Sequence, residues 1–456
     1  MLTLRGSAAG GGTLSPAPRA APAAYQQPAV PTASPLPESL LMAGTLFNFI
    51  LCFVHTNLVP VGLLPVVGSE MLILGLALLV PFTLRGRQPG RMDYLLILLL
   101  VNWLMLSLFR QGANLKLFRD VAIIPVFVML GFASCGGALH RRLFWLHMVI
   151  LAFGIWEAIS LTSFVKVFSV ADFFASSRGI ANDDWWIDNG LFLNSVRPEA
   201  RFLIPSLPLH RVSSVFLEPV SMGNYVIIST IWLAGFWQQI PRPMRITGAV
   251  ATVLLLIGSD SRMATVTCLA ILLALPLRRR IPWFAPALTA PLVIAGMFLA
   301  VSLFGLKTGL DDFGGRIAYS VSVFRTFGFE DYAGTSLARM LDVQDAGFGY
   351  LIMSQSLIMV LILWASLFLR RTVTVENRFI HFAIATYLAL NLTVSWSLFS
   401  IKTAALLWFL LGRANRDEQV ALQEAGREPA EEPVPAAPPR PRSAYHATGG
   451  LIIKST

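Results

Sequence analysis

The stretch LFWLHMVILAFGIWEAISL, residues 143–161, decides the fold of this chain, because it is a nearly unbroken run of apolar side chains. A second such run, LLMAGTLFNFILCFV, covers residues 40–54. At 1.5 Å per helical residue, runs of this length match a bilayer core of about 30 Å. No water is available there to bind the peptide groups, and the runs lack the alternation of a membrane β-barrel. We therefore expect helices.

The composition also favours a lipid solvent. Only 13% of the residues are charged, against about 25% in a typical soluble domain. The net charge of +10 is spread over loops, so basic loops beside membrane spans explain it more simply than a nucleic-acid partner, and we expect no such partner. Cys52, Cys135 and Cys268 fall inside predicted spans, so we expect no disulfide framework, no metal site and no cofactor.

Outward from these runs, the sequence predicts an all-α polytopic membrane protein with about 12 transmembrane helices and two large extracytoplasmic loops. The predicted membrane domain covers residues 38–412, with the loops at residues 162–221 and 306–349. The Pro- and Ala-rich ends, residues 1–37 and 413–456, are predicted to be disordered cytoplasmic tails. The polar GSDSR, residues 258–262, is predicted to be a tight turn between two helices. The predicted spans are Leu40–Val54, Val66–Phe82, Tyr94–Phe109, Val121–Gly136, Leu143–Leu161, Met222–Trp237, Ile246–Ile257, Met263–Leu277, Trp283–Gly305, Tyr350–Leu369, Phe379–Val394 and Leu398–Leu411.

The short loops divide unevenly in basic residues, and this asymmetry predicts that both termini are cytoplasmic. The loops on the external side hold only Arg110, Lys116, Arg119 and Arg262, with Lys402 near the last of them. The loops on the side of the termini hold the larger basic set: Arg85, Arg87, Arg91, Arg141, Arg142, Arg242, Arg245, Arg278, Arg279, Arg280, Arg370, Arg371 and Arg378.

Isolated arginines on the external side are the candidate functional residues. Arg211 opens the run RVSSVFLEPVSMGNY, Arg262 lies in the predicted turn, and Arg316 follows a glycine pair in the second loop. Guanidinium pairs bidentately with phosphate oxygens and does not deprotonate, so these positions favour a shared phosphate ligand. Soluble-enzyme signatures such as a Walker A loop, HExxH or CxxC are absent from the sequence.

Four segments resemble the Wzy-type polysaccharide polymerases and the related O-antigen ligases, which are membrane glycosyltransferases. They are RVSSVFLEPVSMGNY (211–225), LLLIGSDSRMA (254–264), FGGRIAYSVSVF (313–324) and DAGFGYLIMSQSLI (345–358). The resemblance covers roughly residues 94–411, and the order of the segments carries it more than any one of them. One departure is Ser214, which stands where the family often has glycine after the arginine.

The resemblance implies glycosyl transfer at the outer leaflet of a bacterial inner membrane, from a polyprenyl-diphosphate-linked glycan donor to a lipid-linked acceptor. Arg211, Arg262 and Arg316 would stabilise the diphosphate leaving group in place of a metal ion. His210 or Glu218 would act as the general base. Asp345, Trp185 and Trp186 are candidate substrate contacts. A flippase and a chain-length regulator are the protein partners that such a polymerase implies.

Each of these residues also has a purely structural interpretation. The arginines could pair with loop carboxylates such as Glu199, Asp311 or Asp312. Arg262 sits in a turn where Ser259 or Asp260 could be a helix cap, and Glu218 or Asp345 could serve as helix-start carboxylates. The Trp pair could anchor the chain at the interface, and His210 could be merely solvated.

Three further charges lie in or near predicted spans. Glu70 and Glu157 could pair with each other or with an arginine, or lie near the interface, and Lys402 could extend its amine to the interface.

Three functions are compatible with this pattern. A repeat-unit polymerase is favoured because the second loop is long and basic, with Lys307, Arg316, Arg325 and Arg339. An O-antigen ligase that transfers glycan to lipid A core would share the same donor chemistry. A lipid-linked oligosaccharide transporter should instead keep its charges along a central cavity and have short external loops.

Overall fold

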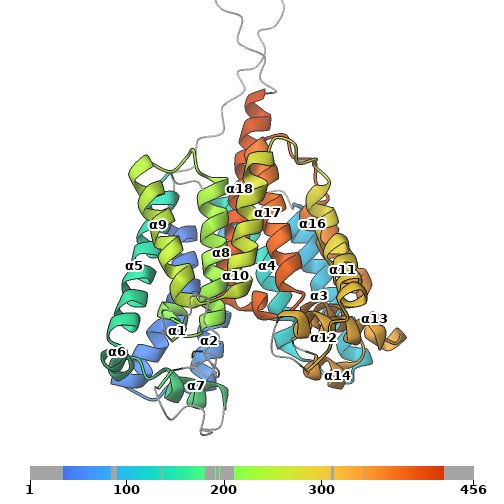
Figure 1. The fold of residues 1–456 in the computed structure, drawn as a ribbon, viewed down its shortest axis with the longest axis horizontal. Coiled ribbons are helices and arrows are strands. Elements are labelled where there is room, and N and C mark those ends of the chain that lie inside the picture. Colours follow the sequence, from blue (N-terminus) through green and yellow to red (C-terminus); the bar gives the residue numbers. More distant parts are fainter. Residues whose placement is uncertain are drawn as a thin grey trace, which may run out of the picture.

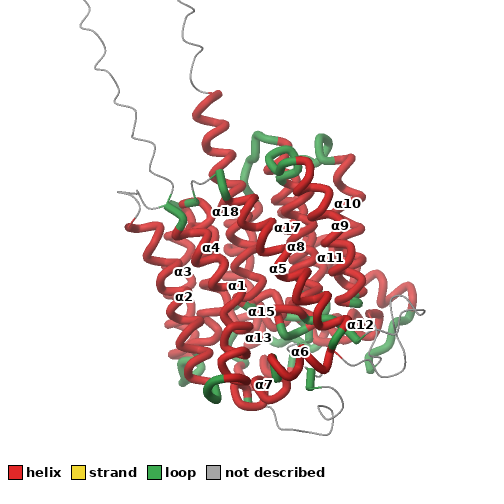
Figure 2. Tube along the Cα trace, turned by 90° about the vertical axis from the view of Figure 1, so that its left-hand side faces the viewer, coloured by secondary structure: helices red, strands yellow, loops and turns green. Residues whose placement is uncertain are grey.

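The structure, a computed structural model, describes residues 34–83, 90–134, 137–179, 190–191, 195, 210–309, 313–343 and 345–425. In this part of the chain every regular element is a helix, as Figure 2 shows, which confirms the all-α prediction. The α-helices are α1 (Leu36–Asn57), α2 (Leu63–Thr83), α3 (Arg91–Phe109), α4 (Leu115–Ala133), α5 (Leu139–Ile159), α6 (Leu161–Val167), α7 (Val170–Arg178), α8 (Pro219–Gly235), α9 (Arg242–Ser259), α10 (Arg262–Ala274), α11 (Ala285–Phe304), α12 (Phe313–Arg325), α13 (Phe329–Ala333), α14 (Leu337–Asp342), α15 (Gly347–Gln355), α16 (Leu357–Phe368), α17 (Val375–Asn391) and α18 (Ile401–Ala425). Short 3-10 helices are η4 (Ser214–Phe216), η5 (Leu275–Leu277) and η6 (Ser397–Phe399).

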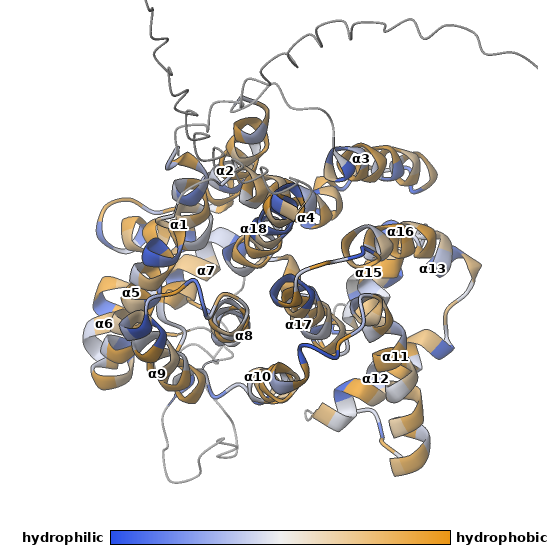
Figure 3. Ribbon diagram, turned by 90° about the horizontal axis from the view of Figure 1, so that it is seen from above, coloured by the Kyte–Doolittle hydropathy of each residue, from blue (hydrophilic) through white to orange (hydrophobic). Residues whose placement is uncertain are grey.

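The helices form one bundle with a buried centre and an apolar outside. Seen along the bundle in Figure 3, α4, α8, α17 and α18 lie in the middle, and α2, α3, α5, α9 and α11 surround them. The apolar windows of α2, α3 and α11 are only 22%, 22% and 17% buried. Their outward leucines and isoleucines would be an aggregation surface in water, whereas lipid tails solvate them.

Five helices in the described part of the chain are long and apolar enough to cross a bilayer by themselves: α1, α2, α3, α5 and α11. Each of the predicted spans coincides with a helix or a helix pair, but the total number of spans stays a prediction. The remaining long helices fall short of this criterion for different reasons. For example, α8 has only 17 residues, and α4 carries Lys116, Arg119 and Asp120 in its first two turns.

The predicted span Tyr350–Leu369 is not a single straight helix. It is divided into α15 and α16, which meet at an angle of 108°. Ser356 stands at the break with a φ of 75°. Its hydroxyl accepts a hydrogen bond from the amide of Met359 at 3.3 Å and so caps α16. If the pair is one broken span, the candidates rise to six.

Arg110 binds the backbone that this break leaves unpaired. Its guanidinium donates hydrogen bonds to the carbonyls of Met353 at 2.8 Å and Ser354 at 3.0 Å, near the end of α15. It also donates to the carbonyl of Gly334 at 2.8 Å. Carbonyls at a helix end have no partner within the helix, so one side chain here replaces the partners that the bend removes.

The centre of the bundle depends on the close approach of α4 and α18. A Cβ atom added to Gly131 would lie 2.1 Å from the carbonyl oxygen of Phe409, and one added to Gly412 would lie 2.1 Å from that of Val128. The missing side chains therefore allow the two backbones to touch, as small residues commonly do between membrane helices.

The bundle has two distinct ends. The beginning of α1 and the end of α18 lie at one end, and α6, α7, α12, α13 and α14 lie at the other (Figure 1). Arg142 donates to the carboxylate of Glu38 at 3.3 Å, which fixes the beginning of α5 beside that of α1. Because α18 continues to Ala425, residues 413–425 are helical, although the sequence placed them in a disordered tail.

Candidate functional site

The segment that carries Arg211 is held against α5 by a buried carboxylate. The side chain of Glu157 is fully buried and accepts backbone hydrogen bonds from Ser213 at 3.0 Å and Ser214 at 2.6 Å. Nε2 of His210 lies 3.4 Å from its Oε1. Glu157 therefore orders the chain just before α8, which is a different role from the side-chain pairing that the sequence suggested for it.

Ser214 adopts a left-handed backbone conformation, with a φ of 50°. Such a conformation is uncommon for residues other than glycine. Ser214 therefore stands at a position whose backbone conformation glycine adopts more readily. One backbone hydrogen bond from Ser214 to Glu157 and one from the Ser214 hydroxyl to the carbonyl of Ile150, each at 2.6 Å, hold it there.

The segment of Arg211 packs against the turn that carries Arg262. The amide of Val212 donates to the carbonyl of Gly258 at 2.8 Å, and Nε of Arg211 donates to the carbonyl of Ser259 at 3.2 Å. Arg262 is the first residue of α10, so the predicted turn between α9 and α10 is confirmed. Two arginines from distant segments thus flank the same few backbone atoms.

The cap of α10 also packs tightly against α8. The hydroxyl of Ser261 accepts a hydrogen bond from the amide of Ala264 at 3.2 Å. A Cβ on Gly223 would lie 2.7 Å from that hydroxyl oxygen. Gly223 therefore lets the first turn of α8 approach the start of α10, and Ser261 rather than Ser259 or Asp260 is the cap.

The other predicted site residues lie on separate elements. Arg316 is exposed in the first turn of α12, one turn before Ser320, whose hydroxyl donates to the carbonyl of Thr393 at 2.6 Å. Asp345 is exposed just before α15 and is not its capping residue, which is Ala346. Trp185 and Trp186 lie outside the described residues.

Glu218 is the centre of a partly buried charge cluster. It precedes α8, and its carboxylate lies 2.6 Å from the guanidinium of Arg178 on α7 and 3.1 Å from the amine of Lys402 on α18. Burial alone would raise the pKa of Glu218, but Lys402 and Arg178 beside the carboxylate lower that pKa to about 2. At neutral pH the group is therefore an anion engaged by two cations.

Lys402 itself does not reach toward the interface, as the sequence suggested it could. Its side chain is only 1% exposed, and the amine also donates to the carbonyl of Phe216 at 3.0 Å. It therefore ties the start of α18 to the segment before α8.

A second cluster lies at the beginning of α4. Arg119 is 2.7 Å from the carboxylate of Glu70 on α2 and 2.6 Å from that of Asp120. The hydroxyl of Tyr350 on α15 donates to Asp120 at 3.0 Å. Glu70 thus has an arginine partner inside the bundle, which is one of the alternatives that its sequence position left open.

The two clusters are neighbours. The charge of Lys116 is close enough to Arg178 for repulsion, and that of Lys402 is close enough to Glu70 for attraction. The amine of Lys116 also lies 4.3 Å from the centre of the Trp396 ring, a cation–π distance. Cationic side chains from α4, α7 and α18 therefore share one region at the end of the bundle opposite the termini.

Of this region, sequence reasoning identified only Glu218 as a candidate site residue. Its cations, Lys116, Arg119, Arg178 and Lys402, come from distant parts of the chain. A usable signal was the grouping of Lys116, Arg119 and Asp120 in an otherwise apolar helix, since charges at membrane depth are costly and commonly functional. Among the described residues, no group of three or more His, Cys, Asp or Glu side chains is arranged to hold a metal ion.

No known protein family, curated protein or solved structure matches this chain. The resemblance to polymerases and ligases stays a prediction that depends on the four quoted segments.

Proposed function

We propose that this protein is a membrane glycosyltransferase that polymerises polyprenyl-diphosphate-linked oligosaccharide repeat units into exopolysaccharide or O-antigen at the outer leaflet of the bacterial inner membrane. The observation that carries this proposal is the packing of the Arg211 segment against the turn of Arg262, where two guanidinium-bearing segments meet. Lys116, Arg119, Arg178 and Lys402 are further cationic side chains, at the end of the bundle opposite the termini.

The reaction needs little from the protein besides charge and position. The acceptor hydroxyl oxygen attacks the anomeric carbon of the donor glycan and forms the new glycosidic bond. The bond from that carbon to the diphosphate oxygen breaks, and the diphosphate leaves with the electron pair. Arg211 and Arg262 stabilise the negative charge that grows on this leaving group, and Arg316 on α12 is a third cation for it.

His210 is the better of the two candidates for the general base. It precedes Arg211 directly, and its Nε2 lies 3.4 Å from Oε1 of the buried Glu157, so the side chain is placed next to the arginine segment. Glu218 is poorly suited to this role, because an ionised carboxylate with a pKa near 2 and two cationic partners is a weak base. We assign Glu218 to positioning the start of α8.

The test is polymerisation by purified protein in lipid vesicles supplied with a polyprenyl-diphosphate repeat unit. We expect a ladder of products, and its loss in the Arg211→Ala and Arg262→Ala variants while single lipid-linked units persist. Lysine at either position should restore little, because it lacks the bidentate geometry. Arg325→Ala is the matched control, since Arg325 is exposed at the end of α12. Normal product length in both arginine variants would refute the proposal.

An O-antigen ligase is the second candidate, because it would use the same lipid-diphosphate donor and the same arginines, with His210 beside Glu157 as its base. The resemblance implies that such ligases use a histidine in a comparable loop. Adding lipid A core to the same vesicles separates the two activities, because a ligase would label the core and form no ladder. Movement of the lipid-linked unit across the vesicle membrane without new glycosidic bonds would instead indicate a transporter.

A further inference from the structure

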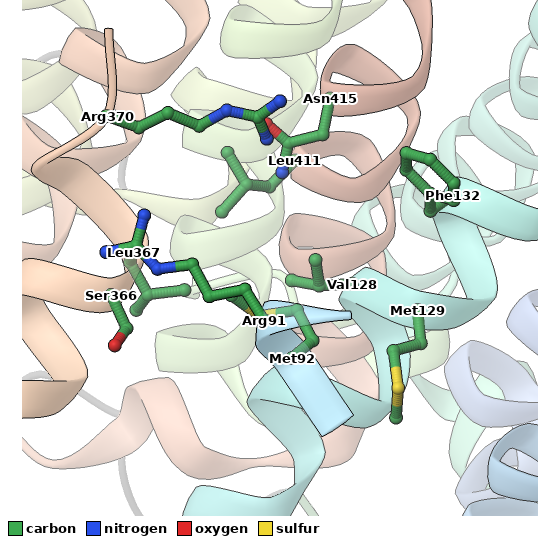
Figure 4. Close-up of a pocket in the computed structure, with 10 residues that line it drawn as sticks. All are labelled: Arg91, Met92, Val128, Met129, Phe132, Ser366, Leu367, Arg370, Leu411 and Asn415. Carbon is green, nitrogen blue, oxygen red and sulfur yellow. The ribbon is translucent and has the colours of Figure 1, made fainter. Parts of the chain in front are cut away.

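A pocket lies at the opposite end of the bundle, where both termini of the described chain emerge. It is formed between α3, α4, α16 and α18 and has a volume of about 130 Å³. Two arginines, Arg91 and Arg370, line it together with apolar side chains that include Met92, Val128 and Leu367. Figure 4 shows the two side chains along the pocket, with the guanidinium of Arg370, from the segment after α16, next to Asn415 and that of Arg91, from α3, next to Leu367.

The charges of these two arginines are not compensated by carboxylates of the described chain. Their like charges are near enough to repel each other, and among the residues that the structure describes neither one forms an ion pair. Arg91 donates to the carbonyl of Ala365 at 2.9 Å, whereas Arg370 is half-buried without a hydrogen bond to the described chain. An anion between the two guanidinium groups would remove this repulsion.

The surroundings of the pocket indicate what kind of anion fits. Its volume is well below the roughly 300–1,000 Å³ of sites that enclose a whole organic ligand. The outer faces of the two adjoining helices are apolar, with Ile97 on α3 and Leu361 on α16 each 59% exposed. The site therefore has room for a phosphate-bearing headgroup, and a lipid-facing surface beside it along which acyl chains can lie.

We propose that this pocket binds the headgroup of an anionic phospholipid, with Arg91 and Arg370 as the phosphate ligands. Basic pockets between membrane helices on the cytoplasmic side are suited to acidic lipids. The proposal is independent of the glycosyltransferase activity, because the pocket lies at the other end of the bundle from Arg211 and Arg262.

Native mass spectrometry of the full chain in detergent tests it, with phosphatidylglycerol and phosphatidylcholine of identical acyl chains as probes. We expect retention of phosphatidylglycerol over phosphatidylcholine. A basic residue near a membrane surface contributes about fivefold to such binding, so Arg370→Gln should weaken it about fivefold and the double variant Arg91→Gln/Arg370→Gln about 25-fold. The matched control, Arg279→Gln/Arg280→Gln, removes two exposed arginines at the same end of the bundle and should leave binding unchanged.

Equal retention of the two lipids, or unchanged binding in the double variant, would overturn the proposal. Displacement of phosphatidylglycerol by excess inorganic phosphate, with phosphate alone stabilising the protein equally, would also overturn it in favour of a free-anion site. If the double variant does not fold, Arg370→Gln alone decides, because Arg370 has no hydrogen bond to the described chain to lose.

Discussion

Replacing Glu218 by glutamine should be among the most destabilising single changes at the charge cluster. The substitution keeps the shape of the side chain but removes the charge that faces the fully buried Lys402. A neutral amide imitates the protonated acid. The lowered pKa of Glu218, about 2 instead of 4.5, therefore corresponds to a decrease of about 3 kcal/mol in the free energy of unfolding when the charge is removed. Breaking a buried ion pair costs about 3–5 kcal/mol in general, which is consistent.

Variants of the two cations beside Glu218 test whether the loss comes from the buried ion pair with Lys402. Arg178→Gln should cost at most about 1 kcal/mol, because that side chain is 41% exposed. Lys402→Met leaves Glu218 with Arg178 as a partner. The double variant Glu218→Gln/Lys402→Met should therefore lose less stability than the two single changes added together. The difference between the sum and the double variant should be about 1–3 kcal/mol.

The assay is unfolding of each detergent-purified variant by titration with a denaturing detergent, followed by circular dichroism, with native helix content required at the start. A loss of 3 kcal/mol corresponds to roughly a 150-fold change in the unfolding equilibrium constant. The reasoning fails if Glu218→Gln costs no more than Arg178→Gln, or if the double variant is strictly additive.

Three further predictions concern stability. Gly131→Ala should cost about 1–3 kcal/mol, because its Cβ would overlap the backbone of α18, whereas Gly296→Ala on α11, with nothing within 4 Å, should be neutral in the same unfolding assay. The folded pKa of Glu218 is depressed, so its contribution is fully present above pH 4.5 and should be lost as the pH falls toward 2; a pH series on wild type and Glu218→Gln measures it, and parallel curves would contradict it. Tyr350→Phe removes a hydrogen bond to Asp120, so the free energy of unfolding should fall by about 1.5–3 kcal/mol and the thermal midpoint should fall with it. An unchanged midpoint would show that Arg119 alone satisfies this carboxylate.

The lengths of the hydrophobic runs predicted where most of the long helices lie, because each run packs against lipid or in the bundle centre along its whole length. The turn at residues 258–262 was also predictable, since five polar or small residues interrupt two apolar runs. The bend at Ser356 was not. Neither glycine nor proline marks it, and its carbonyls are satisfied by Arg110, which lies more than 240 residues earlier in the chain.

The candidate site was predictable only in part, for a similar reason. The meeting of Arg211 and Arg262 follows the order of loops and helices, which a sequence reveals. The convergence of Arg178, Glu218 and Lys402 depends on how α7, α8 and α18 pack, and no local pattern records that. Burial of Lys402 was therefore missed, because a lysine near the end of a hydrophobic run normally reaches water.

The attachment of Arg110 to the end of α15 has a consequence for how this bundle keeps water out. Broken helices at membrane depth usually need solvent or polar neighbours for their loose peptide groups. Here a single guanidinium covers three carbonyls from two segments, so the kink can stay sealed. A shorter or neutral side chain at this position would leave these carbonyls without hydrogen-bond donors from the protein, and water would then enter the bundle at the bend.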